Sequence, residues 1–394
     1  MVDFEISDAG LLVISLTAVE PPLAGEPAEG AFGYAIESGH DPQITPITRI
    51  ATKSLVIFCK VQIGVICGSV SSNCDIKKEE RGWPAMRTYL CALALSIASL
   101  LLSVAPVATL QTKPAEQVLF DDFSYTDKNQ LKKNGWIIRT VPGWPGVPGA
   151  HWLEEGVSLL KDPNQSNNHI LRMTSATDGP GANTTQTQIC HQRKYLEGTY
   201  AARVRFTDDP VSGPGGDQIV QSFYTISPLK APMDLDYSEL DYEYLPNGGW
   251  GIDGPTLYAT TWETFSPEPN WKKDNVFKTA NGSQAGWHTL VTQVHNKNVR
   301  YFVDGKLFAE HGGNYYPEDT MSINFNLWFI RDGMKPANER RQYQEDIDWV
   351  FHQAGVALTP EQVEAAVAAM RRKSIKFRDT VPAKVPALTS PCNF

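Results

Sequence analysis

Cysteine, positive charge and long apolar runs are all scarce in this sequence of 394 residues. None of its six cysteines stands in a Cys-x-x-Cys spacing, so a zinc ribbon or a thioredoxin-type redox site has no support. The 35 Lys and Arg side chains are outnumbered by 44 Asp and Glu side chains, which gives a formal net charge of −9. A chain with this balance lacks the positive field that holds a phosphate backbone, so we expect no nucleic-acid partner.

The one continuous apolar run, LCALALSIASLLL at 90–102, is shorter than the roughly 20 residues that span a bilayer, so we expect no stable membrane insertion. It follows Met86 and Arg87 and precedes small residues, which is the layout of a secretory signal. We therefore predict a signal peptide at 86–108 and a secreted protein. Residues 1–85 show no sustained period, and we interpret them as an upstream extension without assigned structure. The alternative is that the run is a buried apolar helix of a longer protein.

Aromatic and turn-forming residues are plentiful: 10 Trp, 14 Tyr and 16 Phe occur beside 30 Gly and 27 Pro. Short alternating or aromatic runs recur between turn signals over 118–352, and no βαβ spacing is present. Asp304-Gly305, between VRYFV and KLF, is typical of a type I′ hairpin. This pattern predicts an all-β fold, a sandwich of two antiparallel sheets formed by one domain at 118–352. In the remaining 353–394, Thr359-Pro360 predicts the start of a short C-terminal helix, followed by an extended tail.

The densest chemical signal is YSELDYEY at 237–244. Because side chains alternate along a strand, Glu239, Asp241 and Glu243 project from one face. Three carboxylates on one face repel and raise one another's pKa values. Three interpretations compete: a solvated face of an edge strand, half of a calcium site, or a catalytic site.

The catalytic chemistry that suits this pattern is glycoside hydrolysis, which needs one carboxylate as nucleophile and one carboxylic acid as proton donor. A retaining mechanism places the two carboxyl groups about 5–5.5 Å apart. The Cα atoms of Glu239 and Glu243 lie about 13 Å apart along an extended strand, so the two long side chains would have to lean together. Asp241 between them would keep their pKa values apart.

Glu239-Leu240-Asp241-Tyr242-Glu243 resembles the Glu-x-Asp-x-Glu signature of glycoside hydrolase family 16, the laminarinases, lichenases and their relatives. The resemblance covers almost all of 118–352, through VLFDDF at 118–123, GTYAAR at 198–203, the hairpin at 287–305, NFNLW at 324–328 and the closing strand at 346–351. It implies a concanavalin-like β-jelly-roll, with Glu239 as nucleophile, Asp241 as assisting carboxylate and Glu243 as acid/base.

The same resemblance suggests residues that bind substrate. Arg203 matches the Arg of the family's GTYxxR-like strand, and Asn326 and Trp328 are expected beside the nucleophile. Further aromatic candidates, suited to stacking on sugar rings, are Tyr224, Tyr237 and Trp262. Ala201 stands where the family commonly has Glu, and Tyr237 where lichenases have Trp, which leaves the substrate open.

We expect no cofactor in catalysis. The family often carries a structural calcium, to which Asp122 and Asp348 are candidate ligands, although ordinary surface charge is the plainer interpretation of both. Cys190 and Cys392 are the two cysteines left after the signal, and their spacing does not decide whether they form a bridge. Sequons for N-glycosylation begin at Asn164, Asn183 and Asn281.

The sequence thus predicts a secreted, monomeric, endo-acting, retaining glycoside hydrolase that binds polysaccharide and cleaves β-1,3-glucan or mixed β-1,3/1,4-glucan. Two alternatives use the same scaffold: a transglycosylase and a galactan hydrolase. A third, from a different class, is a lectin-like module that binds glycans without turnover.

Overall fold

A computed structural model of the chain describes residues 116–162, 168–179, 181–388 and 392, together with the backbone of five short strands nearer the N-terminus. The chain divides into two compact units, Met1–Gln111 and Thr112–Phe394. The expected signal peptide at 86–108 and the sequon at Asn164 lie outside the described residues.

The first unit contains two small antiparallel sheets. Their strands are β1 (Val2–Ile6), β2 (Leu12–Leu16) and β3 (Leu55–Ile57) in one sheet, and β4 (Cys59–Gln62) and β5 (Ser71–Cys74) in the other. From the sequence we assigned no structure to residues 1–85. Strands of three to five residues are too short to leave a sustained alternation in the sequence.

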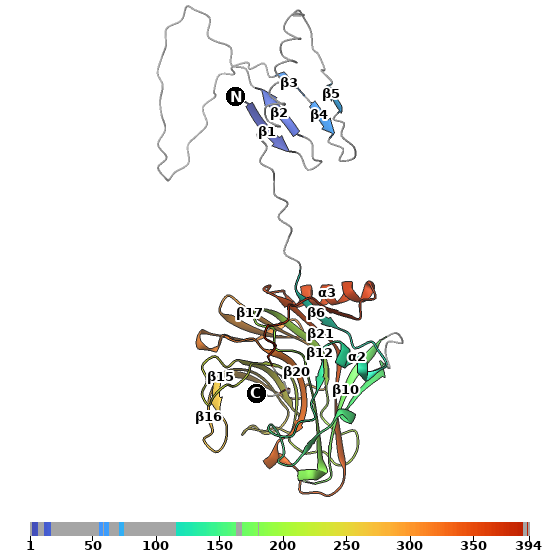
Figure 1. The fold of residues 1–394 in the computed structure, drawn as a ribbon, viewed down its shortest axis with the longest axis vertical. Coiled ribbons are helices and arrows are strands. Elements are labelled where there is room, and N and C mark those ends of the chain that lie inside the picture. Colours follow the sequence, from blue (N-terminus) through green and yellow to red (C-terminus); the bar gives the residue numbers. More distant parts are fainter. Residues whose placement is uncertain are drawn as a thin grey trace, which may run out of the picture. The chain divides into compact units, whose positions relative to one another are not determined.

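The strands of the second unit close on one another like a barrel, and their pairings form two layered, mainly antiparallel sheets (Figure 1). The front sheet has the order β7 (Ile137–Ile138), β11 (Thr184–Cys190), β20 (Ser322–Phe329), β13 (Ile219–Ile226), β14 (Glu239–Leu245), β15 (Thr256–Ser266) and β16 (Lys272–Asn281). The back sheet has the order β9 (Val157–Lys161), β10 (His169–Thr177), β21 (Arg341–Ala354), β12 (Gly198–Phe206), β17 (Gly286–His295), β18 (Asn298–Val303) and β19 (Lys306–Gly312).

Strand β11 links the two sheets. Its first residues pair with β10 and with the parallel strand β8 (His151–Trp152), and its last four residues pair with β20 of the front sheet. The long strand β21 pairs through its C-terminal half with β6 (Val118–Asp121), which also pairs with β22 (Phe377–Asp379). The predicted all-β sandwich of antiparallel sheets is confirmed.

The main core lies between the two sheets because alternate side chains of each strand point inward. On β14 the inward residues are Leu240, Tyr242 and Tyr244, which belong to one buried cluster with Ala202 and Leu290 of the back sheet. Opposite this core, the other face of β14 is left free for polar side chains. The hairpin at Asp304-Gly305 has positive φ at both positions, 48° and 78°, as a type I′ turn requires.

Helix α3 (Pro360–Arg372) covers the outer face of the back sheet (Figure 1). Thr359 caps its N-terminus in a reciprocal capping box with Gln362, as the Thr-Pro signal predicts. Val363 and Val367 pack on a second apolar cluster whose sheet members include Trp349. The segment after the helix is not simply an extended tail, because β22 adds to the sheet beside β6.

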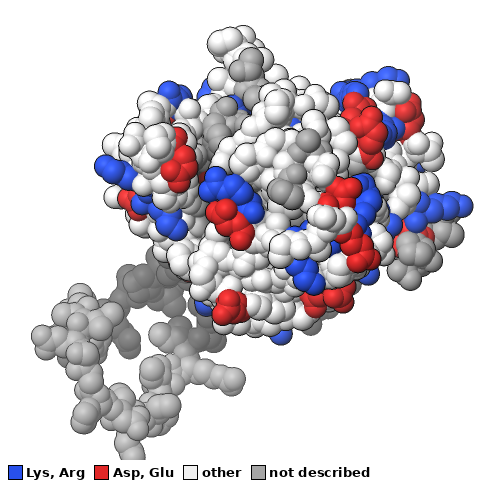
Figure 2. All heavy atoms as spheres, turned by 90° about the horizontal axis from the view of Figure 1, so that it is seen from below, with Lys and Arg blue, Asp and Glu red and all other residues white. Residues whose placement is uncertain are grey.

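The other helices are short. They are α2 (Lys128–Lys133) and the 3₁₀ turns η1 (Glu154–Gly156), η2 (Gly181–Asn183), η3 (Gly313–Tyr315) and η4 (Arg331–Gly333). Within the described residues, no helix combines the length and apolar character needed to cross a membrane. On the face drawn in Figure 2, Lys and Arg side chains lie beside Asp and Glu side chains, so this face carries charges of both signs.

Candidate active site

The three predicted carboxylates lie on the outer face of β14, near the middle of the front sheet. Strand register places Asp241 between Tyr224 of β13 and Thr260 of β15, and Glu239 beside Trp262. All three carboxylates line a cleft of about 350 Å³, a volume within the usual range of about 300–1,000 Å³ for ligand sites. Glu239 and Glu243 are partly exposed to this space, whereas Asp241 is buried.

The Glu239 carboxylate accepts a hydrogen bond of 2.5 Å from the hydroxyl of Tyr237. Burial raises the pKa of Glu239, and this hydrogen bond opposes the rise because it stabilises the charged form. Tyr237 is 1% exposed, and it packs edge-to-face on Phe265 at 5.3 Å between ring centroids. The hydroxyl is therefore held in place by packing, and it supplies Glu239 with a donor that stabilises the carboxylate anion.

Asp241 accepts a hydrogen bond of 2.8 Å from the indole Nε1 of Trp262. Burial raises the pKa of Asp241 well above its usual range, and the charges of Glu239 and Glu243 raise it further. Because the three carboxylates repel one another, their protonation states depend on each other, and the triplet does not carry three negative charges near neutral pH.

Glu243 accepts no side-chain hydrogen bond among the described residues. Burial raises the pKa of Glu243, and the negative charge of Glu239 raises it further. Because the Tyr237 hydroxyl donates to Glu239 and no described side chain donates to Glu243, the favoured distribution of protons leaves Glu239 ionised and Glu243 protonated. The two glutamates thus differ in their preferred protonation state and line the same cleft, with Asp241 between them.

Aromatic side chains form most of the wide part of this cleft. Trp328 and Trp250 lie 6.4 Å apart between ring centroids on one wall, and Trp262 and Trp271 lie 6.4 Å apart on another. Trp250, Trp271 and Phe277 are 48%, 43% and 51% exposed, which suits flat apolar faces that meet sugar rings. We did not predict Trp271 or Phe277 from the sequence. The sequence places Phe277 in KKDNVFKTAN, where nothing marks it as a cleft residue.

A second, narrower part of the cleft lies on the β13 and β20 side of the triplet, lined by Tyr224, Ser222, Asn326 and Trp328 among others. Its volume is about 50 Å³. Asn326 is 2% exposed, and its Oδ1 atom has no hydrogen-bond partner among the described residues. A buried acceptor without a partner is costly, so this atom is suited to accept from a ligand hydroxyl.

Of the predicted substrate-binding residues, the structure brings Tyr224, Trp262, Asn326 and Trp328 to the cleft. Tyr237 lies beneath it, with its hydroxyl on Glu239 and not among the cleft-lining residues.

Arg203 requires a correction, because β12 belongs to the back sheet and not to the sheet that carries the triplet. Its guanidinium donates to Asp348 at 2.8 Å and lies 4.5 Å from the centre of the Trp287 ring. The motif around Arg203 identified a strand but not the sheet to which the strand belongs.

The residues considered for calcium do not fit a calcium site. The Asp348 carboxylate already accepts from Arg203, Arg371 and Asn168, at 2.8, 2.7 and 2.7 Å. Asp122 lies 4.0 Å from the Arg371 guanidinium. Guanidinium groups thus supply the positive charge here, and the described residues contain no group of three or more His, Cys, Asp or Glu that could hold a metal ion.

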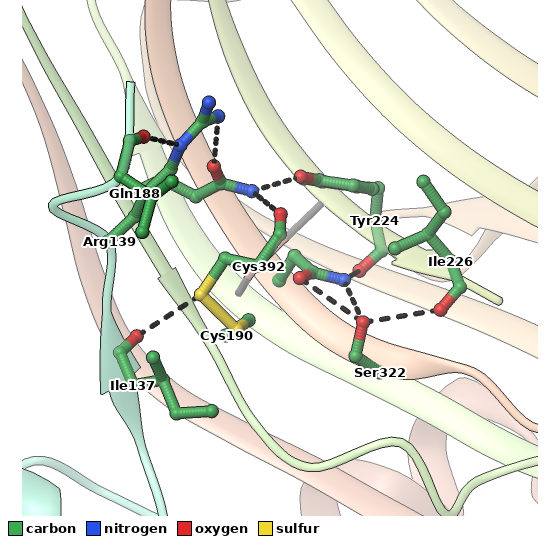
Figure 3. The surroundings of a disulfide bond; sticks show 10 residues. Ile137, Arg139, Gln188, Cys190, Tyr224, Ile226, Ser322 and Cys392 are labelled. Carbon is green, nitrogen blue, oxygen red and sulfur yellow. Dashed lines mark hydrogen bonds between the residues drawn. A yellow bond between two sulfur atoms is a disulfide. The ribbon is translucent and has the colours of Figure 1, made fainter. Parts of the chain in front are cut away.

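Cys190 and Cys392 form a disulfide, with Cα atoms 5.4 Å apart and a sequence separation of 202 (Figure 3). Cys190 ends β11, two strands from β13, and Cys392 lines the narrow part of the cleft. Sequence reasoning left this pairing undecided, and it did not place Cys392 near the carboxylates. Asn183 and Asn281 are exposed, and their glycosylation stays a prediction.

No family model and no curated protein sequence matches this chain. Solved structures do resemble it. One is the glycoside hydrolase family 16 protein of the Bacteroides ovatus mixed linkage glucan PUL, in complex with the product G4G4G3G; it is 18% identical, with a TM-score of 0.45, over 59% of this chain and 98% of that one. Two of the structures are described as family 16 proteins, the family that the sequence motifs resemble.

Two further structures show the range of these neighbours. The Bacillus licheniformis β-glucanase is 17% identical, with a TM-score of 0.41, over 61% of this chain and 99% of that one. A 1,3-α-1,4-β-D-galactose-4-sulfate-3,6-anhydro-D-galactose 4 galactohydrolase is 16% identical, with a TM-score of 0.42, over 64% of this chain and 98% of that one.

Proposed function

We propose that this chain is a retaining glycoside hydrolase of the family 16 type that cleaves β-1,3-glucan or mixed β-1,3/1,4-glucan. One observation carries the proposal: two carboxyl groups of unlike protonation preference line one aromatic cleft, separated on the same strand by Asp241. The sequence signature of the triplet supports the same conclusion. The secreted location and the monomeric state that we predict from the sequence remain part of the proposal.

In the first step, the ionised Glu239 attacks the anomeric carbon while the bond from that carbon to the leaving oxygen breaks. Glu243 donates its proton to this oxygen, so the leaving sugar departs as a neutral alcohol. The Tyr237 hydroxyl keeps Glu239 charged and aimed at the cleft before the substrate arrives. Asp241, fixed by Trp262, separates the two glutamates, and burial together with the charge of Glu239 favours protonation of Glu243.

In the second step, Glu243 is a carboxylate and removes a proton from water, which attacks the anomeric carbon of the glycosyl-enzyme. The bond to Glu239 breaks, and both glutamates return to their starting states. If a sugar hydroxyl replaces the water, the same site performs transglycosylation. Glu239 is thus the nucleophile of the first step and water that of the second, and Glu243 gives up a proton in the first step and recovers one from water in the second.

The test is an assay of reducing-sugar release on laminarin, lichenan, agarose and xyloglucan, with the full chain and Glu239→Gln side by side. We expect turnover on laminarin or lichenan and a loss of at least about 10³-fold in Glu239→Gln, as for removal of a covalent nucleophile. Activity that survives this substitution contradicts the assigned nucleophile. Turnover on agarose alone favours a galactan hydrolase, and binding without turnover on every substrate favours the lectin-like module.

A further inference from the structure

The cleft is unequal on the two sides of the catalytic strand. On the β15 and β16 side its volume is about 350 Å³, whereas the part on the β13 and β20 side measures about 50 Å³. The smaller value is far below that of usual ligand sites, which measure about 300–1,000 Å³. Protein groups therefore occupy the space over the β13 and β20 side of the front sheet, where further sugar rings would otherwise lie.

One of the groups that occupy this space is Cys392. Its disulfide to Cys190 attaches it to the end of β11 (Figure 3). The side-chain Nε2 of Gln188 donates to the Cys392 carbonyl and to the Tyr224 hydroxyl, both at 2.5 Å. Tyr224 stands on the strand next to β14, in register with Asp241. Cys392 is 1% exposed, and it lines the narrow part of the cleft together with the triplet.

The other group is Trp144, in the loop that follows β7. The Arg139 guanidinium donates to the carbonyls of Val141, Gly143 and Trp144, at 2.8, 2.9 and 3.1 Å, and so fixes the shape of this loop. The ring of Trp144 lies 6.1 Å from that of Phe265, which belongs to β15. Trp144 thus reaches from the β7 edge to the far side of β14, and it lines both parts of the cleft.

The loop and the disulfide are connected. Arg139 Nη1 donates to Gln188 Oε1 at 2.9 Å, and the same Gln188 holds the Cys392 carbonyl (Figure 3). Arg139 is 1% exposed, so this connection is buried. The loop that follows β7 and Cys392, which are far apart in the chain, are therefore joined through one glutamine into a single barrier beside the triplet.

We infer that Trp144 and Cys392 form a wall that closes the cleft on the β13 and β20 side, so that the site takes a glycan chain near one of its ends. This inference rests on the proposed function, and it differs from the endo action expected from the sequence. Because few sugar subsites fit between the triplet and this wall, the enzyme releases short products one after another and seldom cuts within a long chain.

Three variants open the wall. Cys392→Ser and Cys190→Ser each remove the tether, and Trp144→Ala shortens the loop side chain. Trp144 is 54% exposed, so its truncation costs little folding stability and serves if the cysteine variants unfold. Trp250→Ala is the matched control, because Trp250 is 48% exposed and lines only the wide part.

The first readout compares loss of viscosity with the number of reducing ends formed on a long glucan. Internal cutting lowers viscosity early, whereas cutting near an end hardly lowers it. We expect slow viscosity loss with the wild type and faster loss per bond cleaved with the wall variants. Early viscosity loss by the wild type, equal to that of the variants, would overturn the inference while leaving the proposed function intact.

The second readout needs no turnover. In a Glu239→Gln background, binding is measured for gluco-oligosaccharides of increasing length. With the wall intact, we expect the affinity for oligosaccharides to stop rising at a shorter chain length. Once the wall is opened, one further sugar ring should raise the affinity by about 5-fold, which is the factor that corresponds to one aromatic contact. Trp250→Ala should weaken binding without changing the length at which affinity levels off. The same length dependence with and without the wall refutes the inference alone. If the protein neither binds nor cleaves any of the glycans, that result refutes the proposed function and the inference together.

Discussion

The hydroxyl of Tyr237 offers the sharpest test of how charge is divided in the triplet. Tyr237→Phe removes the donor of the 2.5 Å hydrogen bond to Glu239 and leaves the ring packing on Phe265. A hydrogen bond to a charged group contributes about 1.5–3 kcal/mol, and each pKa unit corresponds to about 1.4 kcal/mol, so the pKa of Glu239 should rise by about 1–2 units. Because Glu239 faces the cleft, water replaces part of the lost bond, and we expect a rise of about 1 unit.

The sign follows from the state that Glu239 needs for attack. It must be ionised, so a higher pKa moves the acidic limb of the kcat/KM profile toward higher pH. One pH unit below the original limb, the variant should therefore lose about 10-fold more activity than the wild type, and on the alkaline side of the limb the two should converge. The measurement is a pH–rate profile with a soluble glucan at concentrations below KM.

Tyr242→Phe is the matched control, because its hydroxyl donates at 2.8 Å to the Val291 carbonyl in the core, on the opposite face of the same strand. This variant should lose folding stability without moving the limb. An acidic limb that stays in place in Tyr237→Phe would refute the assignment of Glu239 as the anion stabilised by Tyr237. A limb that moves equally in both variants would assign the effect to general loosening of β14.

Three further predictions concern the acid, the core and the cross-link. Glu243→Gln should lower hydrolysis of a glucan by about 10²-fold or more while sparing an aryl glycoside with an acidic leaving group, since that group departs without a proton; equal losses on both substrates would argue against Glu243 as the acid. Asp217→Asn should cost about 3–5 kcal/mol of unfolding free energy in urea, because Arg341, which is fully buried with Asp217 and 2.8 Å from it, would keep an uncompensated charge. Burial alone would raise the pKa of Asp217, but hydrogen bonds, first of all from Arg341, bring it below its ordinary 3.8. The stability that this pair contributes is therefore present above pH 3.8 and is lost as pH falls through the lowered pKa, and a variant as stable as the wild type at pH 7 would contradict this account. Cys190→Ser should lower the thermal midpoint, since a cross-link over a separation of 202 residues contributes up to about 5 kcal/mol in the chain-entropy account; an unchanged midpoint would mean that the bridge is absent in solution.

Features that depend on neighbouring residues were predictable from the sequence. The alternation at 239–243 correctly placed three acids on one face of a strand, Asp304-Gly305 marked a hairpin, and Thr359-Pro360 marked the start of α3. Each of these depends on strand periodicity, turn geometry or helix capping, which act within a few residues.

Features that depend on distant residues were not predictable in the same way. Glu243 faces Ser222, and Ser222 faces Asn326, a residue about a hundred positions later in the chain. The prediction that Arg203 binds substrate does not match its position in the back sheet, because the local motif does not indicate which sheet its strand joins. Trp144 lies in a stretch of Pro-Gly turns that the sequence marks only as a loop, and its place over the cleft depends on the guanidinium of Arg139.

The disulfide has one more consequence, for resistance to proteases. Cys190 and Cys392 close a covalent ring that contains β14 and both catalytic glutamates. Proteases cut preferentially at exposed loop tips, such as the one at Asp304-Gly305, which lies inside this ring. A single cut there leaves two fragments that stay joined through sulfur and through the strands of both sheets. A nicked molecule would therefore run as one species until a thiol reductant is added, and its cleft would remain assembled.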